Sequence, residues 1–265
     1  MDGARFADCL AEEYALLRDA AASADLGTPV PSCPGWMMGN LVQHVAEVYL
    51  HKVAVMRTGR WPRPWPPAEL AAEARLALLG RAYGELTAEF TARDVTQAIT
   101  TWYEPDETVG FWLRRMAQET VIHRIDAELA AGLPSARVPG DLALDGVDEV
   151  LVRFLGYFSL PGDFSHLPDA DGASAIVVSS GGRNWTVSAS RVASGAEQEV
   201  TVEEGTVEEV TVGAGAADDP VVTVSAEPDA MLRWLWGRAG DGAVTVTGAP
   251  AWADYLRRML VATTQ

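Results

Sequence analysis

The sequence predicts an α+β protein of two domains: a four-helix bundle over residues 1–160 and a smaller sheet with helices over residues 161–265. Before about residue 160, apolar residues recur at helical spacing, whereas short alternating Val/Thr-rich segments follow. Strands grouped first and helices later are typical of an α+β sandwich. A chain of 265 residues, 48% hydrophobic and 22% charged, has the size and composition of a folded protein.

The first domain is expected to be helical. Apolar residues three or four apart form one stripe on the expected helices at 5–24 and 38–58 and an arc on that at 107–131, which stops at Gly132; the Pro139-Gly140 turn precedes the last expected helix. Residues 60–67 hold four prolines and two tryptophans, which predicts a loop. The expected helices span residues 5–24, 38–58, 68–91, 107–131 and 144–158.

The second domain is expected to form a sheet with two helices. Gly162–Ala173 is the expected linker, and the acidic run at 203–204 and 208–209 is expected on a solvated strand surface. The expected strands are 175–179, 184–191, 207–212, 221–226 and 243–247, and the expected helices are 229–238 and 252–261.

Charge and hydropathy exclude several classes of protein. The net charge is −17, from 37 acidic and 20 basic residues, which argues against binding to nucleic acid or to anionic membranes. No apolar run reaches the roughly 18 residues of a spanning helix, and no secretory signal is evident at the N-terminus. Two cysteines are too few for a disulfide framework. A cytoplasmic protein without membrane segments is therefore expected.

One group of residues points to metal chemistry. Glu119 and His123 are four residues apart on an expected helix, and so point the same way, one turn apart. His44 borders the apolar arc of the helix expected at 38–58 and can approach a facing helix. If the three converge, they form a three-ligand site with open coordination positions for zinc, iron, nickel or manganese, with zinc the first choice.

Spacing alone leaves alternatives open at this group. His51 lies two turns from His44 on nearly the same face, about 10 Å along the axis, so one cation takes only one of them. Alternatively, Glu119 and His123 only hydrogen-bond to each other, and His44 is a core histidine. Asp126, one turn after His123, either orients that histidine or is an exposed carboxylate.

Five segments together resemble the mycothiol-dependent maleylpyruvate isomerase family. Residues 30–36 (VPSCPGW) with 41–45 (LVQHV) resemble its first motif, and 119–127 (ETVIHRIDA) resemble its second. The resemblance continues through 145–149 (DGVDE) and 234–238 (WLWGR), so it covers most of the chain in the right order. The family implies a DinB-like metal-binding bundle followed by a sterol-carrier-like α+β domain.

The resemblance also implies roles for individual residues. It makes His44, Glu119 and His123 the metal ligands. In the family an arginine of the C-terminal domain is needed for isomerisation, and Arg238 is the position that matches it, with Arg233 as the fallback. The plainer interpretation of either arginine is a cation at a helix end.

Three functions follow from the resemblance. The first is a metal-dependent isomerase that uses a low-molecular-weight thiol, mycothiol, to act on a maleyl-type cis double bond by addition, rotation and elimination. The second is a mycothiol S-transferase on the same scaffold. The third is a non-catalytic protein that binds metal or ligand. The expected partners are therefore a small thiol and an electrophilic substrate.

A few other side chains are weaker candidates. Cys33 precedes Pro-Gly-Trp at a helix start, where a thiolate would be favoured, but a packed thiol in a turn is the simpler interpretation. Trp36, Trp61 and Trp65 either line a pocket mouth or cap a core.

Overall fold

The computed structural model describes residues 1–158, 174–191, 198–206 and 220–264. The chain divides into two compact units, Met1–Arg137 and Val138–Gln265. This division falls before the domain boundary predicted at residue 160, because the helical segment 140–158 packs against the other helices of the second unit and against strand β3 (Gln198–Thr206).

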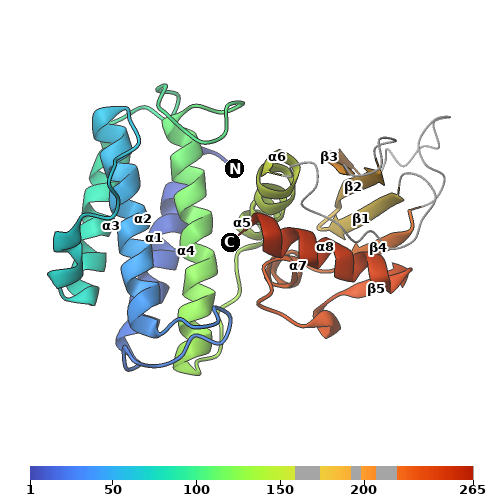
Figure 1. Ribbon diagram of the computed structural model, residues 1–265, viewed down its shortest axis with the longest axis horizontal. Coiled ribbons are helices and arrows are strands. Elements are labelled where there is room, and N and C mark those ends of the chain that lie inside the picture. The colour runs from blue at the N-terminus through green and yellow to red at the C-terminus, as the bar shows by residue number, and fades with distance from the viewer. Residues whose placement is uncertain (159–173, 192–197, 207–219, 265) are drawn as a thin grey trace. The chain divides into compact units, whose positions relative to one another are not determined.

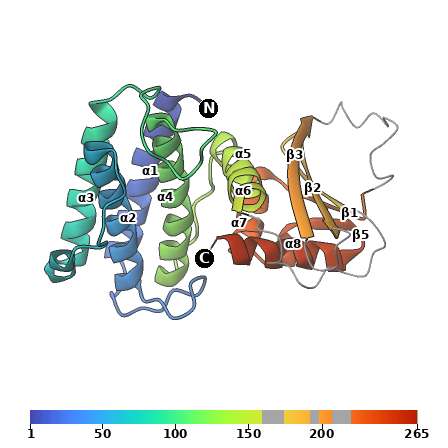
Figure 2. The same cartoon turned by 45° about the horizontal axis from the view of Figure 1, so that its top comes forward.

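The first unit is the expected four-helix bundle, and its four long helices lie side by side in both views (Figures 1 and 2). Helix α4 packs against α1 and α2, and α2 also packs against α3. The helices are α1 (Gly3–Ala22), α2 (Met38–Thr58), α3 (Arg75–Thr91) and α4 (Val109–Ala131).

Residues at the helix ends explain where α2 and α4 begin or stop. The Thr108 side chain accepts a hydrogen bond from the backbone N–H of Phe111 and so caps the start of α4. Gly59 and Gly132 end α2 and α4 in the left-handed conformation, which glycine adopts without strain. The helix predicted at 68–91 is interrupted: a short 3-10 helix, Ala68–Ala72, precedes α3.

Two polar contacts fix the register of the bundle. The hydroxyl of Tyr49 on α2 lies 2.5 Å from Oγ1 of Thr120 on α4, with both side chains buried. Arg124 on α4 is fully buried and donates to Glu13 on α1 at 2.7 Å and to Glu128 at 2.8 Å. The Tyr49–Thr120 contact places the preceding turn of α2 beside the turn of α4 that follows Thr120.

The second unit combines a five-stranded sheet with helices, as expected. Its strand order is β3-β2-β1-β4-β5, with β1 and β4 parallel and the other neighbours antiparallel. Helix α8 packs against β1, β4 and β5. The remaining bounds are α5 (Gly140–Asp148), a π-helical segment (Glu149–Leu155), α6 (Gly156–Phe158), β1 (Ser174–Ser180), β2 (Arg183–Arg191), β4 (Val222–Ser225), α7 (Pro228–Leu235), β5 (Thr245–Gly248) and α8 (Pro250–Thr263).

Four predicted strands match observed ones to within about two residues, and β3 was not predicted. The sequence of β3, Gln-Glu-Val-Thr-Val-Glu-Glu-Gly-Thr, carries three glutamates that obscure its alternation. The strand predicted at 207–212 and the linker at 162–173 lie outside the described residues. Across the described part of the chain, every helix is too short or too polar to cross a membrane.

Candidate metal centre

The three side chains singled out by sequence spacing meet between α2 and α4 of the first unit. Nε2 of His44 lies 3.2 Å from Oε1 of Glu119, and Nε2 of His123 lies 3.2 Å from the same oxygen. Each residue offers one ligand atom, and these atoms all lie within 4.8 Å of one another. Two imidazoles from two helices thus converge on one carboxylate oxygen.

His51 does not join this group. Its Nδ1 lies 3.2 Å from Nζ of Lys52, and its ring packs against Trp61 and Trp65. The structure therefore brings His44, and not His51, to Glu119 and His123. Sequence spacing did not distinguish His44 from His51 as the third candidate ligand, whereas the packing of α2 against α4 does.

A second layer of polar groups orients the cluster. Oδ2 of the fully buried Asp126 lies 3.0 Å from Nδ1 of His123, which turns Nε2 of that ring toward Glu119. Ser32 donates to the other oxygen of Asp126 at 2.5 Å, and the Cys33 thiol lies 3.5 Å from Oδ2. The Ser-Cys segment before α2 thus positions Asp126, and Cys33 packs against a carboxylate.

Charge is balanced around the glutamate. Arg115, one turn earlier on α4, pairs with Oε2 of Glu119 and leaves Oε1 to the histidines. Burial by itself would raise the pKa of Glu119, but Arg115 and the histidines outweigh burial and hold that pKa well below its ordinary value. For His123 the directions are reversed. Burial by itself would lower its pKa, but Glu119 and Asp126 outweigh burial and raise that pKa to about 9.

The donor set fits a divalent cation. In a tetrahedral zinc site with bonds of about 2.0–2.1 Å, ligand atoms lie roughly 3.3 Å apart. Both nitrogen-to-oxygen separations, at 3.2 Å, are close to that edge length. A carboxylate–histidine pair such as Asp126 with His123 commonly supports a metal-bound imidazole. Three ligands leave open positions for another molecule.

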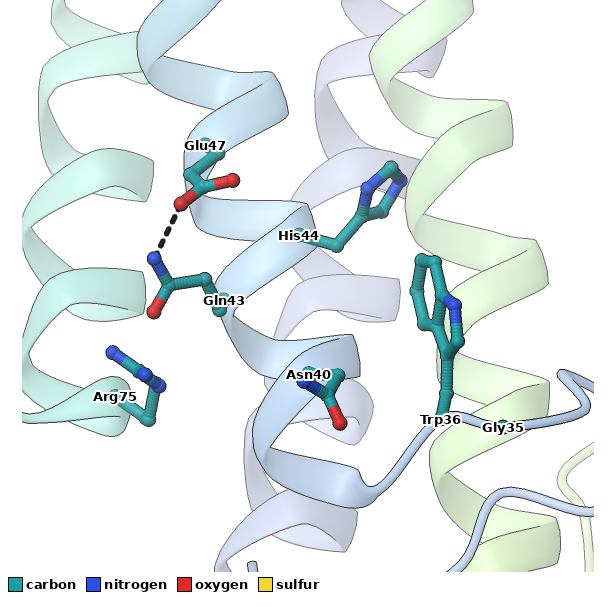
Figure 3. A pocket seen from close by; sticks show the side chains of 7 residues that line it. All are labelled: Gly35, Trp36, Asn40, Gln43, His44, Glu47 and Arg75. Atoms are coloured by element: carbon teal, nitrogen blue, oxygen red, sulfur yellow. Dashed lines mark hydrogen bonds between the residues drawn. The ribbon is translucent and has the colours of Figure 1, made fainter. Parts of the chain in front are cut away.

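A pocket of about 570 Å³ adjoins the centre on the His44 side (Figure 3). In Figure 3 the rings of Trp36 and His44 lie at one side and Arg75 at the other. Gln43 donates to Glu47, and the buried Oε1 of Gln43 has no hydrogen-bond partner among the described residues. The lining residues are Gly35, Trp36, Asn40, Gln43, His44, Glu47 and Arg75.

The two candidate arginines lie in the second unit, just after or within α7. Arg238 follows Gly237, which has a left-handed φ, and its Nη1 donates to the carbonyl of Trp236 at 2.5 Å. Arg233 donates to Asp229 at 2.8 Å, one turn earlier on the same helix. Both arginines therefore interact locally within their unit.

Sequence reasoning missed several polar residues of this region. Arg115 stands four residues before Glu119, so helical spacing could have revealed it. On α2, Asn40 lies four residues before His44, Gln43 directly before it and Glu47 three residues after it, but polar helix residues are too common for that pattern to stand out. They line a pocket only together with Arg75 of α3 and with Gly35 and Trp36, which precede α2.

The first unit is thus a four-helix bundle with a candidate His-Glu-His ligand group at the interface of α2 and α4. Residues 7–128 match the family described as Mycothiol maleylpyruvate isomerase N-terminal domain. The first unit therefore carries the N-terminal domain of this family, and the resemblance stated from the sequence motifs is confirmed.

Two solved structures share the fold of the chain. A crystal structure of the mycothiol-dependent maleylpyruvate isomerase has a TM-score of 0.61, at 13% identity over 93% of each chain. A crystal structure of a histidine-to-alanine mutant of a mycothiol-dependent maleylpyruvate isomerase has a TM-score of 0.59, also at 13% identity over 93% of each chain. No curated protein sequence matches the chain.

Proposed function

We propose that the protein is a metal-dependent enzyme that uses a low-molecular-weight thiol, mycothiol, to isomerise a maleyl-type cis double bond. The observation that carries the proposal is the convergence of two imidazole nitrogens on Oε1 of Glu119, inside a domain of the mycothiol maleylpyruvate isomerase family. The first unit supplies the ligand group, with zinc the first choice of cation.

Each residue has a distinct part in this proposal. His44, Glu119 and His123 hold the cation, Asp126 keeps His123 in the orientation that offers Nε2, and Arg115 fixes the carboxylate of Glu119. When bound, a divalent cation would lower the pKa of a thiol, so that thiolate is available near neutral pH.

The reaction balances without an oxidant or reductant. The thiolate sulfur forms a C–S bond to one alkene carbon, and the π electrons move onto the conjugated carbonyl of the substrate. The remaining carbon–carbon single bond rotates. The electrons then return, the C–S bond breaks, and the trans isomer leaves with the thiolate regenerated.

Arg238 is proposed to hold a carboxylate of the substrate through its planar, two-pronged guanidinium. In that role Arg238→Met abolishes isomerisation but leaves metal content unchanged, whereas the matched variant Arg233→Met retains activity. If Arg233→Met alone is inactive, Arg233 has the role instead. Equal activity of both variants and the wild type would remove the C-terminal arginine from the mechanism.

Metal content tests the centre directly. Protein purified without a histidine tag is expected to hold about one equivalent of divalent metal by elemental analysis. His44→Ala and Glu119→Ala are expected to lose it, and His51→Ala is the matched control that keeps it. Metal-free wild type, or loss only in His51→Ala, would contradict the assignment.

Incubation with mycothiol and candidate electrophiles then tests the reaction. Free thiol recovered after many turnovers, with a trans product, supports isomerisation. A stable thiol conjugate shows an S-transferase instead. Metal-loaded protein that neither isomerises nor conjugates any maleyl-type acid, epoxide or halide indicates a non-catalytic binding protein.

A further inference from the structure

Lys52, the single lysine of the chain, lies on α2 and contacts Trp112 of α4, so it belongs to the same α2–α4 interface as the candidate ligand group. Its Nζ lies 4.5 Å from the centre of the Trp112 ring on α4 and 5.8 Å from that of Trp61 in the Pro-rich loop. Nδ1 of His51 is 3.2 Å from the same Nζ. The ammonium thus sits between two indole rings and an imidazole.

This cation has no carboxylate partner: within the described parts of the chain, no Asp or Glu forms an ion pair with Lys52. Its side chain is partly buried, and burial, as the main cause, lowers the pKa of Lys52 to about 8. Cation–π contacts offset only part of the cost of removing an ammonium from water. The ammonium of Lys52 can therefore still form an ion pair with an anionic ligand.

The position of Lys52 relative to the ligand group follows from helix geometry. His51 is seven residues after His44 on α2, and Trp112 is seven residues before Glu119 on α4, which is about 10 Å along each axis. Lys52 therefore lies two turns along the α2–α4 interface from the centre, with Arg115 at an intermediate level on α4.

The charges along this interface favour an anionic ligand. The chain as a whole carries −17, but here Lys52 and Arg115 supply two positive charges against the one carboxylate of Glu119, which favours the charged form of Lys52 while Arg115 opposes it. Glu119 is already engaged by Arg115 and the histidines. Lys52 is partly exposed and its neighbour Trp61 is 37% exposed, so this end of the α2–α4 interface lies near the surface.

We propose that Lys52 is a substrate-binding residue, and that its ammonium pairs with one carboxylate of a small dicarboxylate that binds at this end of the α2–α4 interface. Charge-assisted hydrogen bonds from an ammonium are stronger where burial reduces its contact with water, and Lys52 is partly buried beside two indole rings. The indole rings also offer apolar walls to the carbon chain of the ligand. Only the choice of a maleyl-type dicarboxylate rests on the proposed function.

A spectroscopic test uses the single lysine. Protein labelled with ¹³C-lysine gives one lysine spin system by NMR. Titrating maleate into the zinc-loaded wild type should shift the Cε–Hε signal of Lys52 saturably, while neutral maleamide leaves it in place. A Lys52 signal that does not respond to maleate would overturn the proposal, and would indicate that Lys52 only anchors the Trp61 loop through cation–π contacts.

Calorimetry with variants gives a second, independent test. Lys52→Met keeps an unbranched side chain but removes the charge, and should weaken maleate binding by about 10–100-fold, the usual effect of a hydrogen bond to a charged group. Lys52→Arg should restore most of the affinity. Arg18→Gln, which removes an exposed cation on α1, is the control for overall charge and should bind as the wild type does.

The outcomes separate this inference from the proposed function. If the wild type isomerises but Lys52→Met keeps its maleate affinity and its KM, the inference fails and the function stands. If Lys52→Met loses maleate affinity while no variant turns over with mycothiol, the inference stands and the function fails. Equal metal content in the wild type and Lys52→Met shows that the substitution changes the binding of maleate and not the binding of the metal.

Discussion

The carboxylate of Asp126 lies 3.0 Å from Nδ1 of His123, and this contact decides which nitrogen of the imidazole faces the ligand group. With Nδ1 engaged by Asp126, Nε2 is the atom directed at Glu119. Ser32 in turn donates to Asp126, so the segment before α2 and one turn of α4 cooperate in placing a single ring.

We predict that Asp126→Asn weakens metal binding without removing it. The amide is nearly the same size but lacks the charge that favours the ring orientation with Nε2 free, and loss of such supporting groups typically costs about 10–100-fold in metal affinity. Competition with a chromophoric chelator measures the effect. Asp19→Asn, an exposed carboxylate on α1, is the control, and an Asp126→Asn affinity equal to that of the control would argue against a supporting role.

Zinc is predicted to raise the Tm of the metal-free protein. A ligand that binds only the folded state at about 100 times its Kd adds roughly 2.7 kcal/mol, which for a unit of this size is on the order of 10 °C. Differential scanning calorimetry of the chelator-treated chain, with and without zinc, checks this.

The shift should persist in His51→Ala and vanish in both His44→Ala and His123→Ala. This contrast matters because His51 was the competitor that spacing could not exclude. A zinc-dependent shift retained in His44→Ala but lost in His51→Ala would reverse the assignment of the ligand.

A buried ion-pair network predicts a large effect on stability away from the centre. Arg124→Met would leave Glu13 and Glu128 buried without their cation, and breaking such a network costs about 3–5 kcal/mol. Urea unfolding measures the loss. Arg57→Met, which removes an arginine paired with Glu85 and Glu89 at the surface, should cost only about 0–1 kcal/mol. Equal losses would mean that Arg124 contributes little beyond packing.

The helices and the Glu119–His123 pair could be predicted because both depend on local spacing. Apolar periodicity located α2 from Met38 to Thr58, the bounds that the structure has. An interval of four residues is enough to place two side chains on one face of α4. The choice of His44 over His51 needs the register between two helices, which the Tyr49–Thr120 contact helps to set. Such pairing is not encoded in either helix alone.

Other features escaped prediction for similar reasons. Arg115 lies four residues before Glu119, a spacing that the sequence shows, but arginines on helices are too common for this one to be singled out. Lys52 is adjacent to His51 in sequence, yet its environment is made by Trp112 from another helix and Trp61 from a loop. Strand β3 was missed because its glutamates break the apolar alternation, although its partner β2 was found. The two compact units divide before the predicted boundary because the segment from Gly140 to Phe158 is helical like the bundle but packs within the second unit.

The environment of Lys52 also predicts a pH dependence of stability. Burial, the largest cause, and Arg115 lower the pKa of Lys52 from 10.5 to about 8, while Glu119 acts in the opposite direction and the His51 imidazole lies beside the ammonium. Between these two pH values the unfolded chain keeps a proton that the folded chain has released. Raising the pH therefore favours the folded state over this range.

Urea unfolding at pH 8, 9 and 10 measures this effect as the difference in unfolding free energy between the wild type and Lys52→Met. The difference should move in favour of the wild type as the pH rises, because methionine does not titrate and the penalty for a buried ammonium is fully present only below about pH 8. Lys52→Arg stays charged throughout and should run parallel to Lys52→Met. A wild-type curve parallel to both variants would show that the ammonium is solvated as in the unfolded chain, and that the indole rings impose no desolvation on it.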